Sequence, residues 1–124
     1  MAIRSPYPDV EVPDVSLHEL LFADIGDRAD RPALIDGSSG RSISYAELAT
    51  AVERLAAALA ERGIGKGDVV GILSPNTPYY AVVFHGVLRA GATATTINTL
   101  YTANEVAEQL RDSGAKLTRS SARW

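Results

Sequence analysis

Apolar residues recur at helical spacing in two stretches of this chain. Between residues 45 and 62 they follow steps of three and four, at Leu48, Val52, Leu55 and Leu59. This spacing predicts an amphipathic helix that lies on an apolar surface. The segment after Pro78, YYAVVFHGVLRA, is apolar on nearly every side. A helix of this kind is buried on most of its faces, so it needs a larger body than it makes by itself.

Each expected helix has its own start signal. Three capping boxes occur, SLHE at residues 16–19, SYAE at residues 44–47 and TANE at residues 102–105. In such a box a hydroxyl accepts a hydrogen bond from a first-turn N–H, and a Glu carboxylate reaches back to the capping residue. Thr77–Pro78 predicts a fourth start, with a hydroxyl cap and a proline at the first helical position. Glycines predict the helix ends, at Gly63, Gly91 and Gly114.

Short apolar runs between these helices predict strands. ALID and RSISY flank the turn sequence GSSG, which predicts a small hairpin. VVGIL (residues 69–73) and ATATTI (residues 92–97) are rich in β-branched side chains. Strands that alternate with helices are typical of a parallel sheet, so we expect an α/β fold with an open parallel sheet flanked by helices. The two runs should be parallel, adjacent or one strand apart, with a right-handed crossover through the helix at residues 78–90.

The two ends of the chain differ from the part between them. Residues 1–15 hold three of the six prolines, which predicts an extended arm lying on a larger body. Residues 16–117 form the expected α/β unit. A last strand begins at Ala115–Leu117, but the apolar pattern then stops, and residues 118–124 (TRSSARW) are expected to be a polar tail outside the unit.

Composition narrows the classes of function. The chain has 124 residues, 46% of them apolar and 22% charged, as in an ordinary soluble domain. A net charge of −3 gives no electrostatic reason to expect nucleic acid or an anionic membrane as partner. Without cysteine, disulfides and thiol chemistry are excluded. No apolar run reaches the roughly 20 residues of a membrane span, and charges interrupt the first 15 residues, so we expect a cytoplasmic protein.

Three glycine- or serine-rich segments are candidates for ligand binding. GIGKGD (residues 63–68) follows a helix and opens a strand, the reverse of a dinucleotide loop, and is interpreted as a helix end and turn. DGSSGRS (residues 36–42) joins two strands and is interpreted as a hairpin loop. SPNTP (residues 74–78) follows a strand and opens a helix, where open α/β sheets bind ligands. No Lys or Arg accompanies it, so a purely structural cap is the alternative.

No catalytic group emerges from the titratable residues. His18 lies in a first helical turn and is expected to be exposed, whereas His85, in the apolar helix, is expected to be a hydrogen-bonded core or interface group. The threonines of residues 92–97 favour a strand first. No nucleophile with a base, no pair of acids and no metal-ligating cluster is identifiable. We therefore assign no catalytic, cofactor-binding or metal-binding residue.

The order of these features resembles a known family. SYAEL, GIGKGDVVGILSPN, GVLRAGATATTIN and LYT..E...QL.DSGAK occur in the order found in the N-terminal part of adenylate-forming acyl-CoA ligases, an AMP-binding superfamily. The 4-coumarate–CoA ligases and their fatty-acyl relatives are the most similar branch, and the likeness covers residues 4–117. There are two departures. Asn98–Thr99 stands where the family usually has Asn-Pro, and TRSSARW replaces a continued apolar strand.

The resemblance implies a two-step reaction in the complete family members. ATP and a carboxylate, aromatic or fatty, form an acyl-adenylate with Mg²⁺, and CoA then displaces AMP to give a thioester. The family's phosphate loop with its Lys, its adenine segment, its ribose-binding Asp and its C-terminal catalytic Lys have no matching position in this sequence. The chain is therefore expected to be a truncated N-terminal portion of a carboxylate–CoA ligase, inactive alone and without a cofactor of its own.

Alternatives to this interpretation remain open. The chain could be a stand-alone α/β binding module that uses the SPNTP crevice, or one half of a split ligase whose partner chain carries the rest. The polar tail is consistent with a shifted reading frame, a misplaced gene end or a pseudogene product. The acyl substrate is not determined by these residues.

Overall fold

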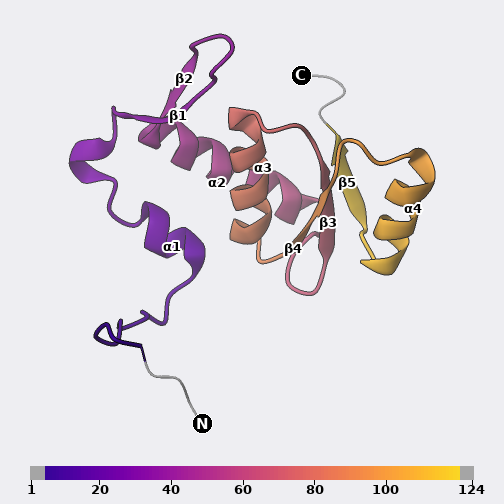
Figure 1. Cartoon of the computed structure of the whole chain (residues 1–124), viewed down its shortest axis with the longest axis horizontal. Helices are drawn as coiled ribbons and strands as arrows, with labels where there is room; N and C mark the ends of the chain where they lie inside the picture. The colour runs from indigo at the N-terminus through magenta and orange to yellow at the C-terminus, as the bar shows by residue number, and fades with distance from the viewer. Residues whose placement is uncertain (1–4, 121–124) are drawn as a thin grey trace.

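A three-stranded parallel sheet forms the centre of the computed structural model, which describes residues 5–120. Strand β3 (Val69–Leu73) lies in the middle, between β4 (Thr93–Ile97) and β5 (Leu117–Ser120). β3 and β4 pair in parallel and in unbroken register, from Val69 opposite Thr93 to Leu73 opposite Ile97 (Figure 1). The prediction of two parallel strands, adjacent or one strand apart and joined through a helix, is confirmed, and the two strands are adjacent.

The last strand continues beyond the apolar pattern. The sequence indicated a strand that breaks off after Leu117, but β5 runs to Ser120, with Thr118 opposite Gly71 of β3. The reason is that parallel pairing uses backbone groups, which polar residues supply as well as apolar ones. Leu117 is half-buried and the other three residues of β5 are exposed. Residues 121–124 of the expected tail lie outside the described residues.

Helices α2 (Tyr45–Glu61) and α3 (Pro78–Arg89) cover one face of the sheet (Figure 1). Strand β3 directs Val70 and Ile72 to this face, and both are almost completely buried. They make the main core with residues of both helices and of the segment before β4: Leu59, Val83, Val87 and Ala92. The amphipathic pattern of residues 45–62 therefore identified the buried side of α2.

Helix α4 (Ala103–Asp112) lies on the opposite face of the sheet. Gly71 of β3 leaves room for it, because a Cβ there would come within 2.8 Å of Leu110 Cδ2. Gln109 Nε2 donates hydrogen bonds to Thr95 Oγ1 and to the carbonyl oxygen of Thr96, each at 2.9 Å. These contacts make the described body a three-layer α/β/α unit.

A hairpin and a short helix precede the sheet. Strands β1 (Pro32–Ile35) and β2 (Ser42–Ser44) pair antiparallel, as predicted. A second apolar cluster joins this hairpin to α1 (Leu17–Phe22), α2 and α3, through Phe22, Leu34, Ile43, Leu48, Val52 and Val82. A 3₁₀ turn (Gly26–Arg28) follows α1, and residues 5–15 of the described chain form neither helix nor strand.

The predicted helix starts are confirmed, but one expected capping hydrogen bond does not form. All three capping boxes form, with both reciprocal hydrogen bonds, at Ser16, Ser44 and Thr102. Thr77 does occupy the N-cap of α3, but its hydroxyl makes no capping hydrogen bond, so that detail was wrong. Pro78, whose missing N–H costs nothing at the first position, supplies the start instead. Within residues 5–120 no helix is long and apolar enough to cross a membrane.

The two sheet-covering helices approach closely at Gly86. A Cβ at this position would lie 2.7 Å from Leu55 Cδ2 and 3.0 Å from Leu55 Cβ. Rotation of the Leu55 side chain cannot remove the second contact, since Cβ is fixed by the backbone of α2. Glycine at position 86 therefore sets the distance between α2 and α3.

We predict that Gly86→Ala lowers the free energy of unfolding by about 1 kcal/mol. Overpacking costs about 1–3 kcal/mol, and the higher helix propensity of alanine offsets about 1 kcal/mol of this cost. The change should be smaller by at least ~0.5 kcal/mol in a Leu55→Ala background, because the contact with Leu55 Cδ2 is then removed and only the 3.0 Å contact with Cβ remains. Urea unfolding followed by circular dichroism of the four chains measures both quantities. Equal effects in the two backgrounds would contradict the close approach.

Asp68 ties the amino ends of all three strands together. It is 8% exposed, and its carboxylate accepts a hydrogen bond from Gly65 N–H at 2.9 Å and pairs with the Lys116 ammonium group. Its carbonyl oxygen accepts a hydrogen bond from Thr93 N–H at 2.8 Å. The bond from Lys116, followed by that from Gly65, lowers the pKa of Asp68 below its ordinary value of 3.8.

This lowered pKa predicts a stability that falls in acid. As the pH drops below about 4, the unfolded chain takes up a proton on this carboxyl first, so stabilisation is lost down to the folded-state pKa. Asp68→Asn should therefore be less stable than the wild type at pH 6 and show a flatter decline between pH 5 and pH 3. Urea midpoints across this range test it, with Asp9→Asn in the exposed arm as the charge-matched control. Parallel declines in wild type and Asp68→Asn would contradict the pairing.

Candidate functional site

A crevice lies at the carboxyl ends of β3 and β4. Since Leu73 and Ile97 are opposite each other, the segments that follow the two strands emerge side by side. They line a hollow of about 420 Å³ together with Tyr80 of α3. The lining comprises Ser74, Pro75, Asn76, Tyr80, Thr96, Ile97, Asn98 and Thr99. The structure therefore places Ser74, Pro75 and Asn76 at the carboxyl edge of the sheet, the position that made SPNTP a candidate for ligand binding.

The polar groups of this crevice are partly engaged in local turns. Ser74 Oγ donates a hydrogen bond to the carbonyl oxygen of Pro75, and Asn98 Oδ1 accepts one from Leu100 N–H, both at 3.0 Å. Every lining residue in the described chain is uncharged. The crevice can offer hydroxyl and amide hydrogen bonds, but it has no cation for a phosphate and no carboxylate for a metal ion.

The hairpin loop lies against the SPNTP segment. Asp36, Gly37 and Ser38 share a hollow with Asn76 and Thr77. Sequence reasoning treated the two segments as separate candidates, because nothing in local spacing indicates that β1–β2 packs beside the start of α3. Arg41 lines a neighbouring hollow with Asp36, and it brings a positive charge to this end of the molecule.

The Asp36 carboxylate is occupied within its own loop. Its Oδ1 accepts hydrogen bonds from Ser38 Oγ at 2.6 Å, Ser38 N–H at 2.8 Å and Ser39 N–H at 3.0 Å. These bonds, led by the Ser38 hydroxyl, lower the pKa of Asp36 to about 2. Such a turn stabilises the hairpin, in agreement with the hairpin interpretation of DGSSGRS.

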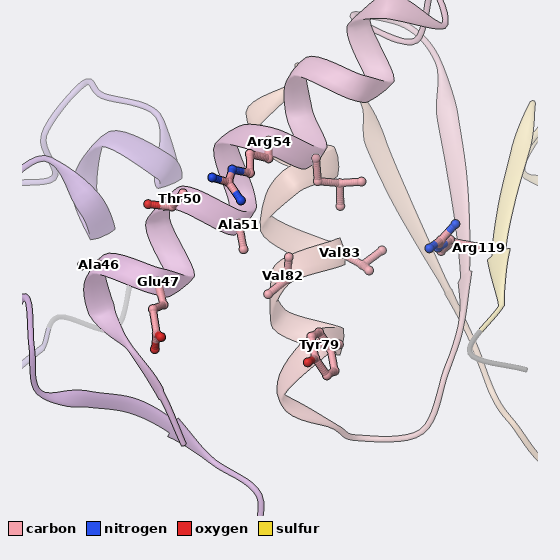
Figure 2. A pocket seen from close by; sticks show the side chains of 10 residues that line it. Ala46, Glu47, Thr50, Ala51, Arg54, Tyr79, Val82, Val83 and Arg119 are labelled. Carbon is pink, nitrogen blue, oxygen red and sulfur yellow. The ribbon is translucent and has the colours of Figure 1, made fainter. Parts of the chain in front are cut away.

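A larger groove lies between α2 and α3. It has a volume of about 620 Å³ and is lined by Ala46, Glu47, Thr50, Ala51, Arg54, Leu55, Tyr79, Val82, Val83 and Arg119. Figure 2 shows that Glu47 and Arg54 point in different directions on α2, whereas Tyr79 and Val83 come from α3. Leu55, Val83 and Arg119 also line an adjoining hollow over β5, so the two hollows form one groove across α2, α3 and β5.

Sequence reasoning missed this groove, although one signal pointed to it. The apolar pattern of residues 79–90 indicated a helix that needs further cover, and Tyr79 of α3 is indeed 47% exposed. The groove contains one carboxylate, and Glu47 Oε2 already accepts a hydrogen bond from Ser44 N–H at 2.8 Å in the capping box. An apolar floor with charges at its rim is suited to packing against protein more than to proton transfer.

The two histidines lie together, which the sequence did not indicate. Phe22 lies between them, with ring centroids 5.2 Å from His18 and 5.7 Å from His85. His18 was expected to be exposed, but it is half-buried because α1 packs on α3. Burial lowers the pKa of both rings, more than any neighbouring charge does. The described contacts of the two histidines include no Ser or Thr hydroxyl that could act as a nucleophile.

The lysines are placed away from the crevice. Lys66 lies in the turn between α2 and β3, and Lys116 pairs with Asp68, both at the amino ends of the strands. The GIGKGD segment is therefore a helix end and turn, with Gly63 at φ +73° just after α2. Within the described residues, no group of three or more His, Asp or Glu side chains could hold a metal ion.

Comparison with models of known protein families shows the family to which the chain belongs. A model described as AMP-binding enzyme matches residues 21–119, most of the chain. The chain belongs to the AMP-binding enzyme family. It is 42% identical over 123 residues to 4-coumarate–CoA ligase 3 of Oryza sativa subsp. japonica, covering 98% of this chain and 22% of that protein. It is 39% identical to 4-coumarate–CoA ligase of Pinus taeda, covering 92% and 21%.

Solved structures show the same family relationship for this chain. The N-terminal subdomain of Klebsiella oxytoca NpsA, in complex with 3-hydroxybenzoyl-AMSN, matches with a TM-score of 0.76 and 29% identity, over 88% of this chain and 27% of that one. The N-terminal domain of FACL13 from Mycobacterium tuberculosis matches with a TM-score of 0.77 and 32% identity, over 83% and 26%. The chain spans about a fifth of the length of the curated relatives cited above.

We predict that Ser38→Ala raises the pKa of Asp36 from about 2 toward its ordinary value of 3.8. The Ser38 hydroxyl contributes most to the lowered pKa, and without it the backbone N–H groups of Ser38 and Ser39 and, more weakly, the Ser39 hydroxyl favour the charged carboxylate. Carbon-detected NMR titration of the Asp36 carboxyl measures the change. Ser39→Ala is the matched control and should shift the pKa less. An unchanged titration in Ser38→Ala would contradict the loop geometry.

Proposed function

We propose that this chain supplies the N-terminal portion of the large domain of an AMP-forming carboxylate–CoA ligase. The observation that carries the proposal is the match to the AMP-binding enzyme family over residues 21–119. The likeness to 4-coumarate–CoA ligases and to N-terminal domains of adenylate-forming enzymes supports it. Because only about a fifth of those relatives is represented, the activity proposed is that of a complete ligase to which this portion contributes.

In the complete ligase the proposed reaction has two steps. The carboxylate of an aromatic or fatty acid attacks the α-phosphorus of ATP, an acyl-adenylate forms and pyrophosphate leaves. The thiol of CoA then attacks the acyl carbon, and AMP leaves with the electrons of the acyl–phosphate bond. Positioning of the reactants and stabilisation of the phosphate charges, to which Mg²⁺ contributes, lower the barrier of the first step.

The described residues do not fit the site for ATP and Mg²⁺. The SPNTP crevice is lined by uncharged side chains, Lys116 is paired with Asp68, and Lys66 lies at the opposite end of the sheet. No step of the reaction is therefore assigned to this chain. Its proposed contribution is structural, namely the strands, helices and apolar faces on which the catalytic part of a ligase is built.

The groove across α2, α3 and β5 supports this structural contribution. Its partly exposed apolar lining includes Ala51, Leu55 and Tyr79, and its rim carries Arg54 and Arg119. An apolar surface of this kind loses contact with water when further protein packs on it, and the loss favours association. The remaining ligase, in the same chain or in a partner chain, is the proposed occupant.

We predict that the purified chain alone catalyses no carboxylate-dependent exchange of pyrophosphate into ATP and forms no acyl-CoA. The reason is that no described residue is placed to hold a triphosphate or Mg²⁺. The assay contains Mg²⁺, ATP and a panel of aromatic and fatty acids. Exchange above the blank that is lost in Lys66→Ala would show that the chain has a catalytic site of its own.

A chimera tests whether this chain can supply the N-terminal portion of an active ligase. Residues 1–120 of this chain replace the corresponding segment of the Oryza sativa ligase, to which they are 42% identical. We expect the chimera to retain exchange activity, because the catalytic groups come from the remainder of that ligase. The control chimera carries Val87→Asp, at a core position that is completely buried, and should be inactive. Equal activity of both chimeras would show that the fold of this portion is not needed.

A further inference from the structure

Helix α1 is attached to α3 through three aromatic rings. His18 and Phe22 come from α1 and His85 comes from α3, and we refer to them as the ring cluster. The Phe22 ring meets His85 edge-on, at an interplanar angle of 85°. Every residue of α1 keeps part of its surface exposed, and Leu20 is 60% exposed. The ring cluster is therefore one of the contacts that hold α1 on the body.

The ring cluster suits neutral histidines and opposes charged ones. His18 Nδ1 is buried and has no hydrogen-bond partner among the described residues. A neutral ring can leave that nitrogen without a proton, but a protonated ring must bury an N–H donor that has no acceptor. His85 is half-buried on α3, with Phe84 5.4 Å away and Phe22 on another side.

The charges that face the ring cluster come from all three helices around it. On α3, Arg89 opposes a proton on His18, and burial opposes it more strongly. Glu53 of α2 and Glu19 of α1 act in the other direction, but they do not reverse the lowering of the His18 pKa. Burial also lowers the pKa of His85, and the charge of His18 lowers it further.

We propose that the ring cluster is a pH-sensitive clasp, which holds α1 on α3 at neutral pH and releases it in mild acid. Phe22 also packs against the apolar cluster of Leu48, Val52 and Val82. Release therefore exposes this apolar surface, between the hairpin and the two sheet-covering helices. The clasp is a property of this chain itself and does not rest on the proposed ligase function.

The direction of the pH effect follows from proton binding. In the docked state the pKa values of both histidines lie below 6.5, and release of α1 raises them, because His18 leaves the contact and His85 loses the cover of Phe22. The released state binds more protons, so docking weakens as the pH falls from 6.5 to the docked-state values and is constant below them. The ratio of docked to released molecules falls by up to about tenfold per pH unit for each histidine.

Hydrogen exchange on the full 124-residue chain tests the clasp. Amides of residues 20–23 include Leu20 N–H, bonded to the Ser16 carbonyl oxygen at 3.0 Å, and Ala23 N–H, bonded to that of Glu19 at 2.9 Å. Their protection, corrected for intrinsic exchange rates, is compared with that of α2 between pH 7.5 and pH 5. We expect the α1 amides to lose protection as the pH falls while the α2 amides keep theirs. NMR titration of both histidine rings should give midpoints below 6.5.

Variants separate titration from packing. His18→Leu with His85→Leu keeps apolar contacts but removes both titrating groups, so protection of α1 should become independent of pH. Glu53→Gln removes a charge that favours the proton on docked His18, so the docked-state pKa falls further and the loss of α1 protection in acid should become larger. Leu20→Gln, on the exposed side of the same helix, is the control and should leave the midpoint unchanged.

Three results would overturn the clasp. One is a titration midpoint of 6.5 or above for the histidine rings of the wild type, which is also the value that an unfolded chain would give. This measurement needs no variant, so it tests the clasp even if the variants fail to fold. Another is unprotected α1 amides at pH 7.5. The third is a double variant that loses α1 protection over the same pH range as the wild type.

Discussion

Burial of strand β3 on both faces is the constraint on which the rest of the structure depends. Val70 and Ile72 point toward α2 and α3 and are 1% and 0% exposed. Gly71, between them, opens the other face to Leu110 of α4. A shift of β3 by one residue would place glycine in the main core and two large side chains against α4. The register of the sheet and the positions of three helices are therefore fixed together.

The same arrangement gives two of the polar candidate segments a structural role and leaves the groove across α2, α3 and β5 accessible to solvent. GIGKGD delivers the chain from α2 to β3, and its Asp68 joins the amino ends of the strands. DGSSGRS turns the hairpin around the Asp36 carboxylate. In contrast, the groove across α2, α3 and β5 leaves Leu55 half-buried and Tyr79 47% exposed. Under the proposed function, further ligase structure packs on this apolar surface.

Local signals predicted the helices and strands, but they could not predict which candidate residues lie beside each other in the folded chain. The capping boxes and Gly63 fixed helix boundaries through backbone groups within four residues of each other. The contact of both His18 and His85 with the Phe22 ring depends on the packing of α1 on α3, which no local spacing encodes. The same holds for Asp36 beside Asn76. Such contacts form between residues far apart in sequence, and packing alone selects them.

The amino-acid sequence by itself determined the α/β class, the parallel pairing of β3 with β4 and the family, because period, caps and motif order are local or cumulative properties of the chain. It did not determine the end of β5, since Thr118, Arg119 and Ser120 lack an apolar pattern and the neighbouring β3 backbone holds them in the sheet. It also left the groove and the ring cluster undetermined. Those features are surfaces shared by several elements, and only the tertiary structure brings their side chains together.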